Sequence, residues 1–398
     1  MKQHNQAILL ILLTTSLAIS CVKDNPEDID PVLVPTVTIE ADVPIGWDTK
    51  GPCTITYSAG STYKELPAII KYRGGSSAKY GKHSFSIELE KKYNFLFLPN
   101  DDDWILNASY IDKTFMRHKI SYDLFRQMSR DNISSKSMYV NVSVNGQSQG
   151  LYLLMEEVNG GMAGIDKTDS MSMMFKDPPL FYEDRIPAPQ DPLNYYQQKY
   201  PKIHETDKTW YIEKFKDFLF NSTDAVFLEK VNEWVDIRNI TDWHILLFLT
   251  NNSDGIMKNF YLYKRNATTP FQIAIWDYDH SFGRDGDNEL NMMERELNCS
   301  RSILIRRLME TPGSEYPENL KNRWLELRNE GIISLDNILE HISRNNRLIK
   351  DEVEKNFEIW PADSKWYFDG NGYQEEVELI KTFTSLRIDQ LDNRFSNH

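Results

Sequence analysis

Short apolar segments, separated by glycine, proline and polar residues, recur along the first part of the chain beyond residue 34. Within these segments the side chains alternate between apolar and polar, or stay apolar for a few positions, which is typical of β-strands. The predicted strands cover residues 36–39, 54–57, 69–72, 84–89, 138–144 and 151–157. Asn145-Gly146 joins the last two, and this dipeptide favours a tight hairpin turn.

Apolar residues spaced three or four positions apart dominate much of the remaining chain and predict helices. The first helix is expected over 113–130, because Ile120, Leu124 and Met128 share one face and Asp112 precedes them as a cap. The further helical segments are 215–220, 226–234, 237–249, 301–356 and 374–394.

Residues 158–210 show no clear period and are rich in glycine, proline and methionine, so we predict a loop insertion there. Its methionines are expected to fill gaps in the packing. The whole pattern predicts an α+β chain, with a β-rich part at 34–157 and a mostly helical part at 158–398. Glu156 ends the last predicted strand, where a linker between the two parts would begin.

Two apolar runs inside the helical part predict a β-hairpin, because a polar loop separates them. The runs are 259–263 and 271–276, within a segment that spans 251–283. Asp254 and Asn259 lie at the entry of this hairpin, and Asp277 and Asp279 lie at its exit. Carboxylates at both open ends of a hairpin can converge on one point, and a hard divalent cation prefers such oxygen ligands.

The same spacing occurs in protein kinases, where an Asp accepts the proton of the substrate hydroxyl while an Asn five residues on and a later Asp hold Mg²⁺. The remainder of the kinase motif differs here. Asn252-Ser253 stands where His-Arg would precede the first Asp, and Tyr278 follows Asp277 in place of Phe-Gly. The alternative is structural, namely acidic residues at solvated strand ends.

A glycine- and serine-rich turn lies between the third and fourth predicted strands. It begins with Arg73-Gly74-Gly75-Ser76-Ser77 and ends at Lys82. Backbone N–H groups in such a turn could cradle phosphates. A strand and not a helix follows, which excludes a P-loop, and a plain hairpin turn is the alternative.

The first residues are typical of a secretory signal, because Lys2 precedes an apolar core that ends in small residues. Leu17-Ala18-Ile19-Ser20-Cys21 resembles a bacterial lipobox, which implies a lipid on Cys21 and removal of residues 1–20. The alternative is an ordinary cleaved signal or a membrane span, although the run is short for a span. Residues 21–33 are acidic and fit a solvated tether, similar to the export signal of Bacteroidetes surface lipoproteins.

Composition narrows the classes of partner. Hydrophobic residues make up 40% and aromatic residues 12% of the chain, enough for a sizeable core. The net charge of −14 argues against nucleic acid, because binding a phosphate backbone requires clustered Lys and Arg. Beyond Cys21 only Cys53 and Cys299 remain, and two lone cysteines predict neither a disulfide nor a metal site.

Taken in chain order, these motifs resemble the CotH family of secretory atypical kinases. The matching positions are Arg73-Gly74-Gly75-Ser76-Ser77, Lys82 with Ser84–Ile87, Asp103-Trp104, Asp112, Thr114, Arg117, Gly150-x-Tyr152, Glu156, Asp254, Lys258–Tyr263 and Trp276–Asp279 with Phe282-Gly283. Each motif is unspecific by itself, whereas their common order along the chain is specific.

The resemblance implies a two-lobed protein-kinase-like fold that binds ATP with Mg²⁺ or Mn²⁺ and phosphorylates a hydroxyl of an extracytoplasmic protein or glycan. It implies that Asp254 is the catalytic Asp, that Asp277 binds the metal, and that Asn259 and Asp279 are neighbouring cation ligands. On the nucleotide side of the cleft it places Arg73, Gly74, Ser76, Ser77, Lys82 and Glu156.

One departure from the family bears on activity. The family usually carries a second lysine after Lys82, where this chain has His83, which is mostly neutral at pH 7. Two hypotheses therefore stay open: an active kinase at the outer membrane or cell surface, attached through its lipid only, or a kinase-fold scaffold lipoprotein that has lost transfer. A glycan-binding surface lipoprotein is a third class, indicated only by the anchor and the nine tryptophans.

Overall fold

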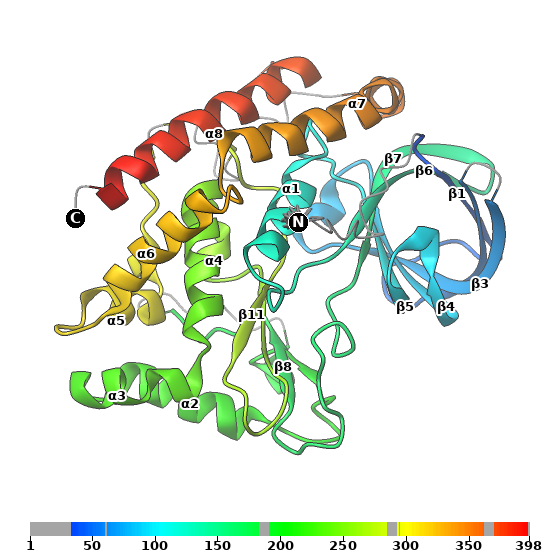
Figure 1. Cartoon of the computed structure of the whole chain (residues 1–398). Helices are drawn as coiled ribbons and strands as arrows, with labels where there is room; N and C mark the ends of the chain where they lie inside the picture. The colour runs from blue at the N-terminus through cyan, green and yellow to red at the C-terminus, as the bar shows by residue number, and fades with distance from the viewer. Residues whose placement is uncertain are drawn as a thin grey trace, which may run out of the picture. The chain divides into compact units, whose positions relative to one another are not determined.

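The computed structural model of the chain describes residues 33–59, 62–182, 191–284, 293, 295–361 and 370–396. The predicted signal peptide, Cys21 and nearly all of the predicted tether lie outside these residues. Residues 33–398 form one compact unit that combines strands and helices (Figure 1). The predicted α+β class is therefore confirmed.

Seven strands of the first part close into a barrel (Figure 1). They are β1 (Thr36–Ala41), β2 (Gly51–Ala59), β3 (Thr62–Arg73), β4 (Ser84–Asn94), β5 (Asn100–Asn107), β6 (Ser137–Val144) and β7 (Gln147–Glu156). Their order is β1-β2-β3-β4-β5-β7-β6, and a parallel pairing of β1 with β6 closes the ring. All six predicted strands of this part are present. The seventh strand, β5, was not predicted because it begins with acidic residues. Neither the closure of the barrel nor the parallel pairing was predicted.

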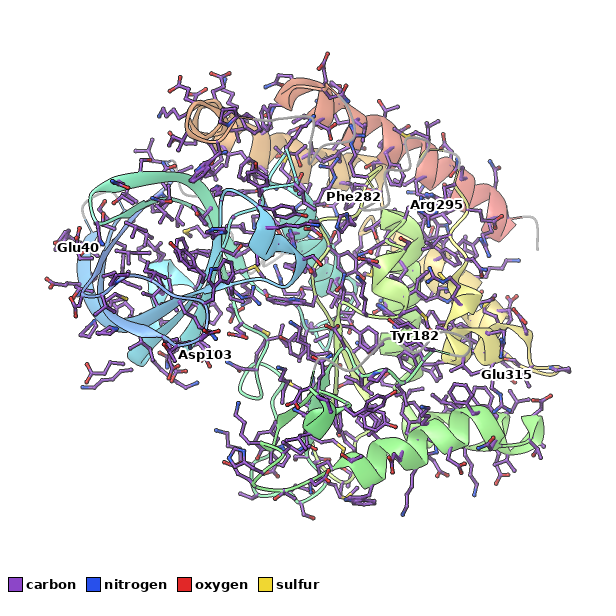
Figure 2. The ribbon with its side chains drawn as sticks, turned by 180° about the vertical axis from the view of Figure 1, so that it is seen from behind. Glu40, Asp103, Tyr182, Phe282, Arg295 and Glu315 are labelled. Atoms are coloured by element: carbon purple, nitrogen blue, oxygen red, sulfur yellow. The ribbon has the colours of Figure 1, made fainter. Side chains whose placement is uncertain are left out.

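Alternation along the strands decides which core each side chain joins. Val37 and Ile39 point into the barrel, whereas Glu40 between the strand's ends is exposed (Figure 2). On β7 both faces are buried: Tyr152 fills the barrel, while its neighbour Leu153 joins the core of the helical part. Successive residues of a strand point to opposite faces, so a continuous apolar run here joins two cores.

The predicted hairpin is present and belongs to a second sheet of four strands in the order β11-β10-β8-β9. Its strands are β10 (Phe260–Lys264) and β11 (Gln272–Ile275), which pair in antiparallel fashion. The predicted loop insertion at 158–210 is wrong in part, because β8 (Met173–Lys176) and β9 (Gln198–Tyr200) lie in it. Four residues are too few to show a period, and β8 forms by pairing with β10.

The helices of the described residues are α1 (Arg117–Met128), α2 (Thr209–Asn221), α3 (Asp224–Trp234), α4 (Ile237–Thr250), α5 (Ile303–Glu310), α6 (Tyr316–Asn329), α7 (Leu335–Ile359) and α8 (Tyr373–Ser396). Helix α4 is buried on all sides from Asn239 to Thr250, which explains its apolar sequence. Helix α7 contacts β7, where the Asn356 side chain accepts a hydrogen bond from the Leu151 N–H at 3.2 Å.

A charge cluster on α1 gives this helix a pH-dependent stability. The Asp123 carboxylate is paired with Lys119 at 3.0 Å and with Arg126. Burial by itself would raise the pKa of Asp123, but the two cations outweigh it and lower the pKa to about 2. Because the folded-state pKa lies below the unfolded one, the stabilisation is present above about pH 4 and is lost as the pH falls through about 2.

We therefore expect Asp123→Asn to lower the free energy of unfolding by about 2 kcal/mol near neutral pH, and by less than half of that at about pH 2.5. Urea unfolding of both proteins at the two pH values measures the difference. An equal loss at both pH values would show that the asparagine disturbs packing rather than charge pairing.

The two cysteines beyond Cys21 lie in different cores. Cys53 is buried in the barrel and Cys299 is buried in the helical part, and both thiols are free. The question of a disulfide that the sequence left open is thus answered for this structure.

Candidate active site

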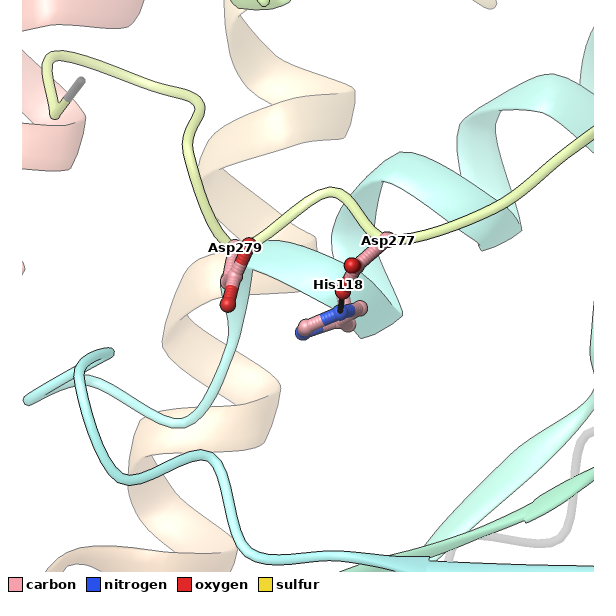
Figure 3. Close-up of side chains that lie close together, drawn as sticks. All are labelled: His118, Asp277 and Asp279. Carbon is pink, nitrogen blue, oxygen red and sulfur yellow. Dashed lines mark hydrogen bonds and ion pairs between the residues drawn. The ribbon is translucent and has the colours of Figure 1, made fainter. Parts of the chain in front are cut away.

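Three side chains from two distant segments converge beyond the end of β11. His118 lies on α1, and Asp277 and Asp279 follow the hairpin, with ligand atoms of all three within 4.8 Å of one another (Figure 3). The His118 Nε2 atom lies 3.3 Å from Asp277 Oδ1. Two carboxylates and an imidazole at this spacing fit a divalent cation.

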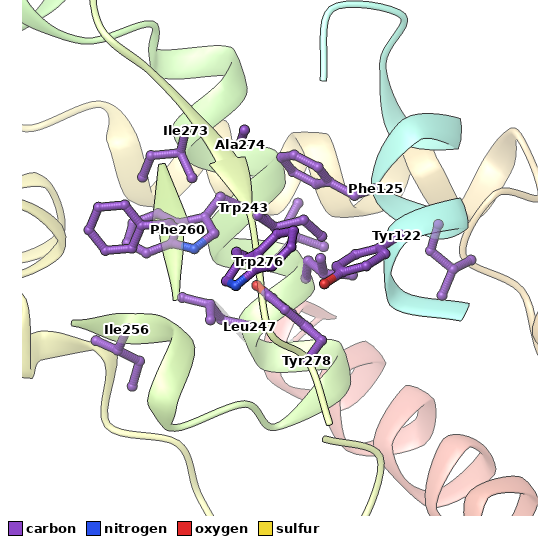
Figure 4. Packing of buried hydrophobic residues seen from close by; sticks show 14 of the residues in the cluster. Tyr122, Phe125, Trp243, Leu247, Ile256, Phe260, Ile273, Ala274, Trp276 and Tyr278 are labelled. Atoms are coloured by element: carbon purple, nitrogen blue, oxygen red, sulfur yellow. The ribbon is translucent and has the colours of Figure 1, made fainter. Parts of the chain in front are cut away.

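Burial of the residues next to Asp277 leaves the two carboxylates accessible. Trp276 and Tyr278 are buried in the core near Tyr122 (Figure 4), whereas the intervening Asp277 and the following Asp279 are only partly buried. The chain leaves the extended conformation at Asp277, and burial of the residues on both sides leaves its side chain partly exposed. The apolar Trp276 and Tyr278 are thus the reason why the Asp-x-Asp spacing produces a pair of convergent carboxylates.

Hydrogen bonds from both hairpin strands fix this turn. The Trp276 N–H donates to the Asn259 carbonyl at 3.0 Å, and the Asn259 side-chain N–H donates to the Asp277 carbonyl at 3.3 Å. The Asp277 N–H donates to the Tyr122 hydroxyl at 3.0 Å. Asn259 and Asp277 both adopt a positive φ, 63° and 58°. The structure therefore brings Asn259 beside Asp277, as their separation across the hairpin predicted.

The two carboxylates of the cluster have pKa values shifted in opposite directions. Burial would raise the pKa of Asp277, but the hydrogen bond and charge of His118, together with Lys176, lower it. Burial raises the pKa of Asp279, and the negative charge of Asp277 adds to this. The pKa values of two adjacent carboxyl groups move apart in this way when no cation balances their negative charges.

Asp254 begins a short 3₁₀ turn (Asp254–Ile256) after α4. Its Oδ2 atom pairs with Lys258 Nζ at 2.9 Å, and both side chains are about half exposed. Burial would lower the pKa of Lys258, but the charges of Asp254 and Asp277 raise it. The Lys258 ammonium group thus pairs with Asp254 and is influenced by the charge of Asp277, and no role for Lys258 was predicted from the sequence.

The glycine-rich turn after β3 lies beside the cluster. The Arg73 guanidinium is 5.5 Å from the centre of the Trp276 ring, directly before Asp277. Burial and then the charges of Asp279 and Asp277 raise the pKa of Tyr80, at the other end of the turn. Gly74 has a φ of 143°, which strains any residue with a side chain and therefore favours glycine. Within the turn, Ser76 is exposed and Ser77 is partly buried.

Lys82 and Glu156 lie within the fold and have no contacts with this cluster among the described residues. Lys82 is buried, and its ammonium group donates to the Ala108 carbonyl at 3.1 Å, to Asn356 Oδ1 at 2.9 Å and to the Leu151 carbonyl. Three acceptors use the three donors of an ammonium group. A role at a phosphate, as the resemblance implied, would require Lys82 to exchange these bonds.

The side chains of Glu156 and His83 also make their contacts within the barrel part of the chain. The Glu156 carboxylate accepts a hydrogen bond from the Lys136 N–H at 2.8 Å, and burial raises its pKa. The His83 ring contacts Trp47 and Tyr72 edge-on, with ring centres 5.0 Å apart in both cases. The departure at His83 therefore places an imidazole among aromatic rings of the barrel.

Two more charged residues beside the cluster were missed because β8 was interpreted as a loop. The Lys176 ammonium lies 5.4 Å from the centre of the Trp276 ring, so this ring contacts two cations. Asp177 accepts a hydrogen bond from the Phe260 N–H at 3.1 Å through Oδ1. The pairing of β8 with β10 brings both residues here, and no sequence signal marks them.

A buried ion network supports the cluster from behind. Arg117 pairs with Asp112 at 2.5 Å and with Glu376 of α8 at 3.1 Å, and its Nε donates to the Ser281 carbonyl at 2.9 Å. Glu376 also pairs with Arg284. The network thus connects the start of α1, the segment after Asp279 and the C-terminal helix.

We expect Arg117→Met to lower the free energy of unfolding by about 3–5 kcal/mol, because it leaves the buried Asp112 carboxylate without its cation. Urea unfolding at neutral pH measures the change. The matched control is Arg238→Met, whose exposed pair with Glu326 is worth at most about 1 kcal/mol. Equal losses in the two variants would contradict a stabilising role for the network.

Comparison with known proteins gives the family. The family model described as CotH kinase protein matches residues 70–391. The chain therefore belongs to the CotH kinase family, as its motifs indicated. It is similar to the inner spore coat protein H of Bacillus subtilis (strain 168), with 28% identity over 275 residues that cover 69% of this chain and 74% of that protein.

Among solved structures, the chain aligns with the crystal structure of a Helicobacter pylori proinflammatory kinase. The alignment covers 88% of this chain and 92% of that chain, with 10% sequence identity and a TM-score of 0.34. A likeness at this score carries no conclusion about the fold.

Proposed function

We propose that the protein is an ATP- and divalent-metal-dependent kinase that transfers the γ-phosphoryl group to a hydroxyl of a protein or glycan outside the cytoplasm. One observation carries the proposal: the ligand atoms of Asp277 and Asp279 lie within 4.8 Å of each other, and the Asn259 side chain donates a hydrogen bond to the Asp277 carbonyl. Membership of the CotH kinase family supports the same reaction class.

The roles follow from the positions of these residues. Asp277 and Asp279 hold the cation, which neutralises phosphate oxygens when bound. Asp254, across Lys258, accepts the proton of the acceptor hydroxyl, and Lys258 offsets negative charge between the two carboxylates. Arg73, beside Trp276, and the backbone of the glycine-rich turn face the phosphates from the barrel side.

The second candidate is a kinase-fold scaffold that binds nucleotide or a partner without transfer. The observation in its favour is Lys82, whose three donors are used inside the fold. ATP is also scarce outside the cytoplasm. A kinase without a lysine at the phosphates would depend on Arg73 and Lys258 for positive charge.

The test is consumption of ATP by purified residues 22–398 with Mg²⁺, with Mn²⁺ and without either metal. An extract of extracytoplasmic proteins and glycans supplies the acceptor. The products that receive the labelled phosphate are then mapped to identify the modified hydroxyl. We expect transfer only with a metal present. Metal-dependent nucleotide binding without any transfer to extract or to the protein itself would favour the scaffold.

The location at the outer membrane or cell surface is also proposed, and it rests on the lipobox-like residues before Cys21. Among the described residues, none of the helices has the length and apolar character needed for a membrane span. We expect Cys21→Ser to move the protein from the membrane to the soluble fraction, because acyl chains anchor by about 0.8 kcal/mol per buried CH₂. Unchanged membrane association of this variant, with its N-terminus cleaved, would contradict lipidation at Cys21.

A further inference from the structure

The cluster of His118, Asp277 and Asp279 is only slightly wider than a first coordination sphere. Ligand atoms about 2.1 Å from an octahedral cation lie about 3 Å apart when adjacent and about 4 Å apart when opposite. The His118 Nε2 atom is 3.3 Å from Asp277 Oδ1, a separation close to that of adjacent ligands, and the ligand atoms of all three residues lie within 4.8 Å of one another, so that small side-chain shifts would bring them around one ion. A single ion between them would therefore touch the imidazole as well as the carboxylates.

His118 is itself buried and only partly satisfied. Its side chain is 2% exposed, and its other nitrogen, Nδ1, has no hydrogen-bond partner among the described residues. The Nε2 atom, on the other side of the ring, faces Asp277 and is the nitrogen that a cation between the carboxylates would meet. The ring sits against Tyr122, with ring centres 5.7 Å apart, which fixes it beside the two carboxylates.

We propose that His118 is a nitrogen ligand of the divalent cation, so that the site binds Mn²⁺, or another cation that accepts nitrogen, in preference to Mg²⁺. Imidazole suits transition-metal ions, whereas Mg²⁺ prefers oxygen ligands. The inference rests on the metal site of the proposed function and adds a ligand from α1, far from the hairpin in sequence. The neighbouring His280 is not a ligand in this proposal.

The alternative is that His118 only donates a hydrogen bond to Asp277 and orients it. Both arrangements place the ring next to Asp277, so loss of activity on mutation would not separate them. Direct coordination differs in one measurable respect, because a bound nitrogen nucleus couples to the unpaired electrons of Mn²⁺.

The test is electron spin echo spectroscopy of Mn²⁺ bound to the full chain, without nucleotide. We expect modulation from a coordinated nitrogen-14 nucleus, and its replacement by the nitrogen-15 pattern when only the histidines are labelled. His118→Gln should lose the signal. His280→Gln is the matched control, because its imidazole lies 3.8 Å from Asp279 yet outside the cluster, and it should keep the signal.

Calorimetric titration with Mn²⁺ and with Mg²⁺ provides a second readout. We expect Mn²⁺ to bind the parent more tightly than Mg²⁺. In His118→Gln the affinity for Mn²⁺ should fall at least as much as the ~10–100-fold typical for loss of a residue supporting a metal ligand. The affinity for Mg²⁺ should fall less, so the preference narrows.

Absence of histidine-derived nitrogen coupling in the parent overturns the inference, whether or not the variants fold. Lack of Mn²⁺ binding also overturns it. The same experiments test the proposed function separately. Nitrogen coupling without phosphoryl transfer from ATP would support His118 as a metal ligand and contradict the kinase activity. Conversely, metal-dependent phosphoryl transfer without nitrogen coupling would support the kinase activity and contradict His118 as a metal ligand.

Discussion

Asp254→Asn is expected to slow phosphoryl transfer by ~10²–10⁴-fold, the usual span for loss of a general base. The substitution keeps the shape of the side chain and removes its charge. Asp254 pairs with Lys258 and is not part of the cluster around Asp277. The affinity for ATP should therefore change little, or improve slightly, because one negative charge near the γ-phosphate disappears.

Transfer rates at saturating ATP and calorimetric ATP affinity with metal measure these two effects. Asp131→Asn, an exposed aspartate beyond the end of α1, is the matched control and should behave like the parent. If Asp254→Asn loses ATP binding, Asp254 holds the metal and the proposed role is incorrect. A parental transfer rate would make Asp254 a solvated carboxylate without a part in the chemistry.

Asp277→Asn is expected to abolish metal-dependent ATP binding, with affinity reduced by ~100-fold or more. Asp277 is the carboxylate that contacts His118, neighbours Asp279 and is bonded through its backbone to Asn259. Triphosphate repels a cluster of carboxylates, so nucleotide should bind only when a cation bridges the two. Without metal, the melting temperature should change little, because asparagine can still accept the His118 hydrogen bond.

Calorimetry with ATP, in the presence of Mn²⁺ and then of chelator, checks this result, with Asp131→Asn again as the control. If the parent protein binds ATP with equal affinity in the presence and absence of metal, the proposed role of the metal in ATP binding is wrong. A variant that melts far below the parent without metal would show that the Asp277 charge is needed for folding.

Most elements of the fold could be predicted from the sequence alone. Alternation and helical spacing predicted six barrel strands, α1, the hairpin and α8, because these patterns depend on which faces are buried. The order of motifs from Arg73 to Gly283 identified the family, and the hairpin pattern predicted that Asn259 would lie near Asp277, whereas Asp254 is not part of the cluster at Asp277 and Asp279. Local rules suffice here, because neighbours along a strand or a turn fix the direction of each side chain.

Only the tertiary structure decided which distant residues share the site. Closure of the barrel through β1 and β6, the pairing of β8 with β10, and the position of His118 all depend on segments separated by tens to more than a hundred residues. Lys82 shows the opposite case, since its motif was recognisable but its ammonium group is enclosed by carbonyls from remote segments. Contacts of this kind leave no period in the sequence, because they are selected by packing of complete elements and not by local spacing.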